Sequence, residues 1–154
     1  MTATVTMLPD ASRYILRGDP SAFSGYGVRL PTEACRAATN GVLSALWLGP
    51  DEWLLLLPEG QALPLDAMAS VVDVSDRQVA IEVRGEYAAE ALNAFNALDL
   101  HIDAFPVGMC TRTLFGKAEI VLWRTALETF RIEVWRSFAP YVLGCLAEAT
   151  REYA

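Results

Sequence analysis

The sequence predicts an α+β fold in which a mostly antiparallel sheet packs against helices. Two observations carry this prediction. Apolar runs of strand length recur between turn signals, and helical spacing of apolar residues is clear in only two segments. The chain has 154 residues, a length that suits one domain over residues 1–154 or, alternatively, two small lobes that meet near residue 70.

Composition narrows the possible function classes. Lys and Arg number 12 against 19 Asp and Glu, which gives a formal net charge of −7. Such an acidic chain is poorly suited to nucleic acid or to an anionic membrane surface, because both require clustered basic residues. Hydrophobic residues make up 53% of the chain, too many for a disordered protein and enough to leave an apolar surface for a partner or a generous core.

Membrane spans, a secretory signal and disulfides are not expected. The longest apolar run, at 53–57, ends at Pro58 and is far shorter than the roughly 20 residues of a membrane span. The N-terminal residues carry no positive charge ahead of an apolar block. Three widely spaced cysteines, Cys35, Cys110 and Cys145, form no paired motif and favour reduced thiols in a cytoplasmic protein.

The first third of the chain indicates short strands joined by turns. Residues 1–12 are polar and without pattern, and we expect them to be frayed. A strand is expected at 13–17. The Gly/Ser/Tyr loop at 23–27 either folds over a ligand or only connects its neighbours.

A hairpin is predicted where apolar residues 43–48 and 53–57 flank a Gly-Pro-Asp-Glu turn. Proline presets the backbone of the turn, and the aspartate can bond to the local backbone. The four successive leucines at 54–57 indicate a strand that is covered on both faces and therefore central in its sheet.

The middle of the chain predicts two strands and two helices. A weak helical stretch lies at 65–70, and a strand is expected at 71–74. Residues 79–83 alternate between apolar and other residues, which indicates a strand with one wet face. The apolar spacing at 88–95 then predicts an amphipathic helix with Glu86 and Glu90 pointing away from the core.

The last third predicts a three-stranded meander followed by a helix. Strands are expected at 110–115, 118–124 and 130–135. Ser137 is the expected N-cap, and Pro140 falls in the first helical turn, where its missing N–H costs nothing. The expected core stripe of this helix is Phe138, Tyr141, Val142, Cys145, Leu146 and Ala149.

The pairing of the last two strands is fixed by their apolar residues. One face stays apolar only if even-numbered residues pair with even-numbered residues, which requires a connection with an odd number of residues, such as 125–129. The residues that share this face are Ile120, Leu122, Ile132 and Val134.

The opposite face of this hairpin predicts a partner interface. It holds Val121, Trp123, Arg131 and Trp135, and the arginine can stack on Trp123. Trp and Arg are enriched at energetically important interface positions. The alternative is that another element of the same chain covers this face.

His101 is the only histidine and therefore the only candidate imidazole base. In an extended segment it would share a face with Asp99 and Asp103, and two carboxylates would raise the pKa of the imidazole. Such a group can act as a base or as a poor metal site. The alternative interpretation is an exposed polar edge before a turn.

A second polar cluster follows the strand at 71–74. Ser75 lacks the glycines of a nucleophile elbow, so Asp73 and Asp76 are expected to brace the turn, with Arg77 paired to one of them. Cys110 lies two residues from Arg112, which is weak support for a reactive thiol. The sequence also has no glycine-rich phosphate loop after a strand, and its single histidine rules out a two-histidine metal site. Taken together, these features predict no catalytic residue and no metal ligand.

An ordered set of short motifs resembles the gamma subunit of heterotetrameric sarcosine oxidase over about three-quarters of the chain. The motifs are WLGPDEWLL at 47–55, DVSDR at 73–77, LDL at 98–100, FPVG at 105–108, RT at 112–113 and RSFAPY at 136–141. That family is in turn similar to the folate-binding domain of the glycine cleavage T protein. The resemblance thus implies an α+β architecture of that kind.

The resemblance also implies a function. The expected protein is a non-catalytic subunit of a cytoplasmic complex that oxidises sarcosine to glycine and passes the one-carbon unit to tetrahydrofolate. FAD, FMN, NAD and tetrahydrofolate are then expected on the larger, flavin-bearing subunits, and no cofactor on this chain. Asn96 and Ala97 stand where many relatives carry Cys-Pro, and no folate-binding residue is carried over. The alternative is a free-standing folate-binding or one-carbon-transfer protein of the same fold.

Overall fold

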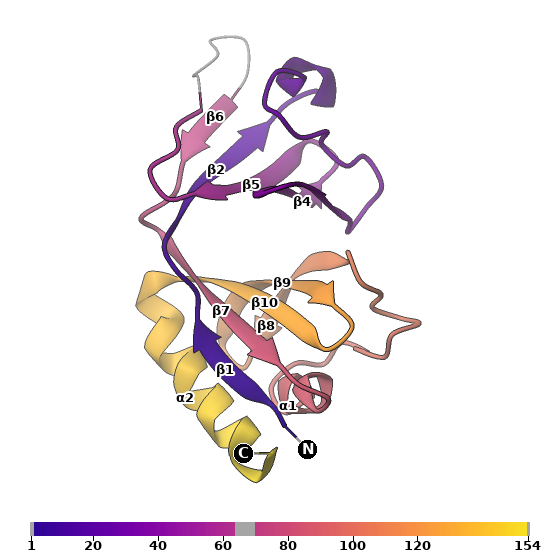
Figure 1. Cartoon of the computed structure of the whole chain (residues 1–154), viewed down its shortest axis with the longest axis vertical. Coiled ribbons are helices and arrows are strands. Elements are labelled where there is room, and N and C mark those ends of the chain that lie inside the picture. Colours follow the sequence, from indigo (N-terminus) through magenta and orange to yellow (C-terminus); the bar gives the residue numbers. More distant parts are fainter. Residues whose placement is uncertain (1, 64–69, 154) are drawn as a thin grey trace. The chain divides into compact units, whose positions relative to one another are not determined.

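The computed structural model describes residues 2–63 and 70–153, and the chain divides into two compact units. One unit, Asp10–Arg77, is inserted between the two segments of the other, Met1–Pro9 and Gln78–Ala154. We call them the inserted unit and the terminal unit. Each contains its own five-stranded sheet, and the pairings between strands are antiparallel in both (Figure 1). The α+β class with antiparallel sheets is therefore confirmed.

The inserted unit is a sheet with the strand order β3-β4-β5-β2-β6. Its core gathers around Trp53, whose indole N–H donates to the carbonyl of Pro31 at 2.8 Å. The elements are β2 (Ala11–Arg17), the 3₁₀ turn η1 (Pro20–Phe23), β3 (Ala37–Asn40), β4 (Leu43–Gly49), β5 (Glu52–Pro58) and β6 (Ser70–Asp73).

The leucine-rich strand β5 is the central strand of this sheet, as the sequence predicts. Residues 53–57 are all buried, because β5 pairs with β4 on one side and β2 on the other while both of its faces are covered. The expected hairpin of β4 and β5 and the strand at 13–17 are also confirmed. The expected helical stretch at 65–70 falls largely outside the described residues, and its last residue, Ser70, begins β6.

The terminal unit has the strand order β1-β7-β10-β9-β8. Helix α2 runs alongside this sheet in Figure 1, and its Val142 and Leu146 belong to the same core as the strands. The elements are β1 (Thr4–Met7), β7 (Gln78–Arg84), α1 (Ala88–Asn93), β8 (Cys110–Phe115), β9 (Ala118–Ala126), β10 (Thr129–Trp135), η2 (Arg136–Phe138), α2 (Ala139–Thr150) and η3 (Arg151–Tyr153).

The pairing of β9 with β10 follows the expected parity. Leu122 lies opposite Ile132, and both are fully buried. The strands run further than expected, to Ala126 and from Thr129, and the odd residue is taken up by a register shift beside Thr129. A β-bulge of this kind keeps every later side chain on its proper face.

Two expectations about strands are wrong. The segment expected to be frayed, residues 1–12, is ordered over its described part, because Thr4–Met7 form the edge strand β1 and pair with β7, and β2 begins at Ala11. The face of β7 expected to be wet is wet only in part, since Gln78 and Ala80 are 4% and 1% exposed. Gln78 donates to the buried carboxylate of Glu133 at 3.2 Å, so a polar pair is buried where solvent was expected.

Two expectations about helices also need correction. Helix α1 ends at Asn93, shorter than the expected helix, although Glu86 and Glu90 are exposed as predicted. Ser137 is not the N-cap of α2, because it lies within η2 and Phe138 takes that position without a side-chain cap.

The apolar stripe of α2 is only partly a core stripe. Val142 and Leu146 are fully buried, whereas Phe138 and Tyr141 are 45% and 38% exposed. Cys145 is partly buried and packs against the core, which fits the expected packing role. The helix therefore carries apolar residues on more than its core side.

Leu146→Ala is expected to lower the free energy of unfolding by about 2–5 kcal/mol, because it removes a buried side chain and leaves a cavity. Chemical denaturation of the full chain measures this. Leu143→Ala makes the same change at a partly buried position of the same helix and serves as the control. Equal losses for the two variants would mean that Leu146 does not anchor α2.

Candidate functional site

Arg124, near the end of β9, is a buried charged residue on the core face of the terminal unit's sheet. Arg124 lies two residues after Leu122 and four after Ile120, so its side chain points to the same face of the strand. The residue is 6% exposed. The guanidinium Nη1 donates to the carbonyls of Leu100 and Phe105, each at 2.9 Å. Nε and Nη2 donate to the carbonyl of Leu127 at 3.1 and 2.7 Å.

These bonds make Arg124 a clamp between two turns. One turn spans residues 99–105, and the other connects β9 to β10. Burial lowers the pKa of Arg124 from its ordinary value, although an arginine stays protonated in proteins. The cation is held by carbonyl dipoles and by the Phe130 ring, whose centroid lies 4.8 Å from the guanidinium carbon.

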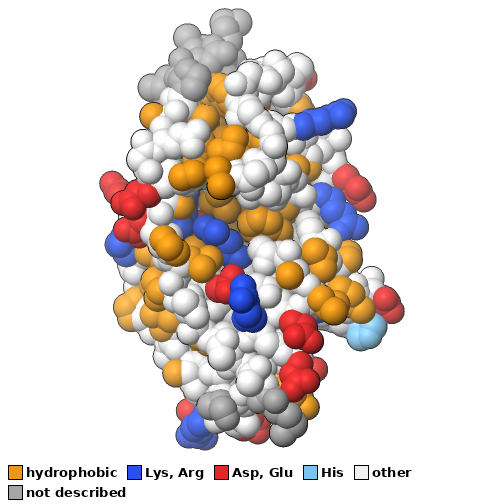
Figure 2. All heavy atoms as spheres, in the orientation of Figure 1, with side chains coloured by type: hydrophobic (Ala, Val, Ile, Leu, Met, Phe, Trp, Pro, Cys, Tyr) orange, Lys and Arg blue, Asp and Glu red, His pale blue; other side chains and the backbone are white. Residues whose placement is uncertain are grey.

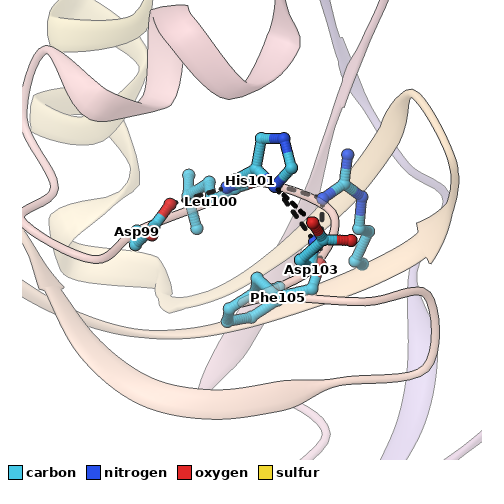
Figure 3. A network of polar contacts seen from close by, with 6 residues as sticks. Asp99, Leu100, His101, Asp103 and Phe105 are labelled. Atoms are coloured by element: carbon cyan, nitrogen blue, oxygen red, sulfur yellow. Dashed lines mark hydrogen bonds and ion pairs between the residues drawn. The ribbon is translucent and has the colours of Figure 1, made fainter.

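The acidic residues around His101 shape the first of these turns (Figure 3). The Asp99 carboxylate accepts the backbone N–H of His101 at 2.9 Å, and Nδ1 of His101 accepts the N–H of Asp103 at 3.2 Å. The segment is therefore a turn and not an extended strand, which corrects the expected shared face. The His101 and Asp103 side chains are exposed, and Nδ1 lies 3.6 Å from the Asp103 carboxylate.

A pocket of about 320 Å³ opens beside this clamp. Its lining combines the buried Arg124 and Phe130 with His101 and with carboxylates that are themselves exposed. It contains no hydroxyl, thiol or amine that could act as a nucleophile. The lining residues are Gly85, Glu86, Ala89, Glu90, Leu100, His101, Ile102, Arg124, Leu127, Glu128 and Phe130.

Sequence reasoning missed Arg124, although a signal was present. The parity that places Ile120 and Leu122 on the core face also places Arg124 there, since the three residues lie two apart on one strand. A charged residue at a core position requires partners. One partner, the carbonyl of Leu127, is local, but the carbonyls of Leu100 and Phe105 belong to residues distant in sequence, which no residue pattern indicates.

The second polar cluster braces the inserted unit. The Asp73 carboxylate accepts the backbone N–H of Ser75 at 2.9 Å, and the Ser75 hydroxyl accepts the N–H of Arg13 at 2.9 Å. Hydrogen bonds from the Ser75 hydroxyl and backbone hold the pKa of Asp73 below its ordinary value. The bracing role predicted for Asp73 is confirmed, and Ser75 ties the turn to β2.

The Gly/Ser/Tyr loop borders a second cavity, of about 430 Å³, within the inserted unit. Asp19 fixes the start of this region, because its carboxylate accepts from both the backbone N–H and the hydroxyl of Ser21. Phe23 is buried in the core, so part of the loop is structural. The cavity is lined by Pro20, Ser21, Phe23, Ser24, Gly27, Val28, Arg29, Leu30 and Thr32.

The residues predicted to form a partner interface differ strongly in exposure. Trp123 is 9% exposed and Trp135 is 52% exposed. Among the described residues, none accepts a hydrogen bond from the buried indole N–H of Trp123. Arg131 directs its Nε toward the Glu133 carboxylate at 3.2 Å, which differs from the expected stacking on Trp123.

A metal site and a membrane-spanning helix are two further features that would bear on function. Within 2–63 and 70–153, no three His, Cys, Asp or Glu side chains gather closely enough to hold a metal ion. In that part of the chain, no helix combines the length and apolar character needed to cross a membrane.

Comparison with protein families decides the family of this chain. The family model described as "Sarcosine oxidase, gamma subunit family" matches residues 19–152. The chain belongs to the sarcosine oxidase gamma subunit family. The resemblance carried by the short motifs is thereby confirmed.

Curated members of the gamma subunit family are similar at about the same level. The chain is 32% identical over 118 residues to sarcosine oxidase subunit gamma of Corynebacterium sp. strain P-1, and 30% identical over 146 residues to that of strain U-96. These alignments cover 72% and 89% of this chain. The chain spans 58% and 71% of the length of these two relatives.

Solved structures agree with this family. A chain of heterotetrameric sarcosine oxidase from Corynebacterium sp. U-96 matches with a TM-score of 0.87 and 26% identity, over 98% of this chain and 85% of that one. The glycine cleavage system aminomethyltransferase T from Bartonella henselae matches with a TM-score of 0.69 at 13% identity, over 95% of this chain and 45% of that one. The second likeness shows the fold alone and confirms the expected cleavage-T-like architecture.

Arg124→Met is expected to lower the free energy of unfolding of this gamma-family chain by about 3 kcal/mol, because it leaves buried carbonyls without donors. Denaturant titration measures the loss. Arg112→Met changes an exposed arginine of the same sheet and is expected to have a small effect. A loss for Arg124→Met as small as that of the control would show that the clamp does not stabilise the fold.

Proposed function

We propose that this chain is the non-catalytic, structural gamma subunit of a heterotetrameric sarcosine oxidase complex. In that complex sarcosine is oxidatively demethylated to glycine, and the one-carbon unit passes to tetrahydrofolate. The observation that carries the proposal is the family match over residues 19–152. The likeness to a chain of a solved heterotetrameric sarcosine oxidase, over 98% of this chain, supports it.

The division of labour in the complex is part of the proposal. FAD, FMN, NAD and tetrahydrofolate are assigned to the larger, flavin-bearing subunits, and none to this chain. In support, the sequence has no glycine-rich phosphate loop. The acid–base candidates Asp73, Asp99 and His101 make hydrogen bonds within turns, and this use suits a scaffold.

The cellular setting follows from the same proposal. A cytoplasmic complex without nucleic-acid or membrane partners fits the formal charge of −7, because both of those surfaces attract basic proteins. Trp123, Arg131 and Trp135 are proposed to contribute to contacts with the larger subunits. Trp135 is the most exposed of the three.

A free-standing folate-binding or one-carbon-transfer protein of the cleavage-T-like fold is the second candidate. It is favoured by the fold likeness to aminomethyltransferase T and by the pocket whose lining includes His101, Glu86 and Glu90. The first candidate has the stronger support, because family membership is more specific than fold.

A pull-down of the tagged full chain from its native cells tests the proposal directly. Large chains that carry a flavin absorbance spectrum are expected to co-purify with it, because a structural subunit functions within its complex. A tag-only sample from the same cells is the control. Folate binding by the pure chain together with the absence of large partners would favour the second candidate instead.

The pure recombinant chain is expected to show no sarcosine oxidase activity and no bound flavin, because flavin chemistry is assigned to the larger subunits. Absorbance between roughly 350 and 500 nm reports bound flavin, and oxygen consumption with sarcosine reports activity; conjugated cofactors carry such chemistry in enzymes. A stoichiometric flavin spectrum from the pure chain would contradict this assignment.

A further inference from the structure

Helix α2 of the terminal unit carries a second apolar side in addition to its core side. No charged residue occurs at positions 137–147, a run of eleven that spans most of the helix. Val142 and Leu146 are buried in the core, whereas Pro140, Gly144 and Ala147 are exposed. A surface helix normally places charged and polar residues opposite its core stripe, so α2 has the composition of a helix that is covered on both sides.

Exposed aromatic residues stand where this helix begins. Trp135, Phe138 and Tyr141 are 52%, 45% and 38% exposed, and they follow one another at spacings of three residues through η2 into the first turn of α2. We call Trp135, Phe138, Tyr141 and Gly144 the outer face of α2. Figure 2 shows hydrophobic and uncharged surface over the first part of this helix, with charged side chains near its C-terminal end.

The position of Tyr141 is fixed before any partner binds. Its hydroxyl accepts the backbone N–H of Lys117 at 3.0 Å, in the turn between β8 and β9. Gly116 in that turn has a φ of 57°, and a side chain there would collide with the Tyr141 hydroxyl. A preorganised aromatic ring loses little conformational entropy on binding, which favours its use as an interface anchor.

Gly144 makes the outer face accessible to close approach. Apart from Gly144 itself, its two chain neighbours and the nearby backbone of α2, no described heavy atom lies within 4 Å of the point where its Cβ would stand. The backbone of α2 is therefore bare at this position, one helical turn beyond Pro140. A partner can contact the helix here without displacing a side chain of this chain.

The charges beside the aromatic part of the outer face favour one kind of occupant. Lys117, whose backbone N–H bonds Tyr141, and Arg136, which follows Trp135 in sequence, are both exposed. The acidic Glu148 lies one helical turn beyond Gly144 and pairs with Arg151 at 2.9 Å, away from the aromatic residues in sequence. In a two-fold dimer built on this face, each copy would present the same basic edge to the other. A different protein with an apolar surface and acidic residues around it fits better.

We propose that the outer face of α2 is the surface that docks onto a larger subunit of the sarcosine oxidase complex, at an apolar patch with acidic surroundings. The inference rests on the proposed function and adds to it the location of the contact. It extends the interface predicted from the sequence from Trp135 onto α2.

The test compares capture of the larger subunits by tagged full-length variants co-expressed with them. Gly144→Glu places a charged side chain on the outer face and is expected to weaken capture by about tenfold or more. Helix propensity rises when an exposed interior glycine is replaced, so this variant is expected to fold. Val107→Glu introduces the same side chain at another exposed position of the terminal unit and is the matched control.

Charge at the edge of the face is tested separately. Lys117→Glu combined with Arg136→Glu is expected to slow association, with the difference from wild type shrinking as salt increases, because screening weakens exposed charge pairs. Circular dichroism melting of each pure variant verifies folding. Gly144→Glu removes no side-chain contact of this chain, so loss of capture by a variant that melts like wild type reports on the docking surface and not on folding.

Each outcome has one meaning. Loss of capture with Gly144→Glu but not with Val107→Glu supports the docking surface. Equal capture by wild type and Gly144→Glu overturns the docking surface and leaves the proposed function intact. If the wild type itself captures no larger subunit, the proposed function fails and the inference fails with it. Self-association of the pure chain that Gly144→Glu abolishes, with capture unchanged, assigns this face to a second copy and overturns the proposal.

Discussion

The register of β10 between β7 and β9 is the constraint on which the terminal unit depends. β10 pairs with both neighbours over most of its length, so a slip by one residue would reverse the faces of the sheet on two sides at once. The register places Phe130 opposite Arg124 on the core face, and Arg131 opposite Trp123 on the other. Both the clamp and the tryptophan face are consequences of this one pairing.

Arg124 shows how a buried charge can organise a fold without a carboxylate partner. Two turns, one around residues 100–105 and one around residue 127, direct backbone carbonyls toward the same guanidinium. Its planar fork lets a single side chain hold several acceptors in fixed directions. The Asp99 carboxylate and the Nδ1 atom of His101 each accept a backbone N–H within the first turn and so stabilise it locally. Residues that resemble a catalytic cluster in sequence are thus used to hold the chain in shape.

The pattern of apolar residues predicted most strands and missed features that depend on pairing between distant residues. The three strands of the final meander follow from apolar spacing, and the central position of β5 follows from its continuous run of leucines. β1 was missed because Thr4–Met7 are mostly exposed and pair with residues about eighty positions away. The burial of Gln78 was missed for a related reason, because its partner Glu133 lies 55 residues further along the chain.

In helix α2, the spacing of apolar residues does not indicate which of them are buried. Phe138 and Tyr141 satisfy the same spacing rule as Val142 and Leu146, yet only the latter two are buried. In a helix with charged residues on one side, the uncharged side must be the core side. Residues 137–147 contain no charge, so the pattern cannot separate a core side from an outer side. That ambiguity has a physical origin, because a helix that is buried on one side by its own sheet and on the other by a partner must be apolar on both. The feature that made the core stripe of α2 hard to predict is the same feature that makes its outer face suited to another subunit.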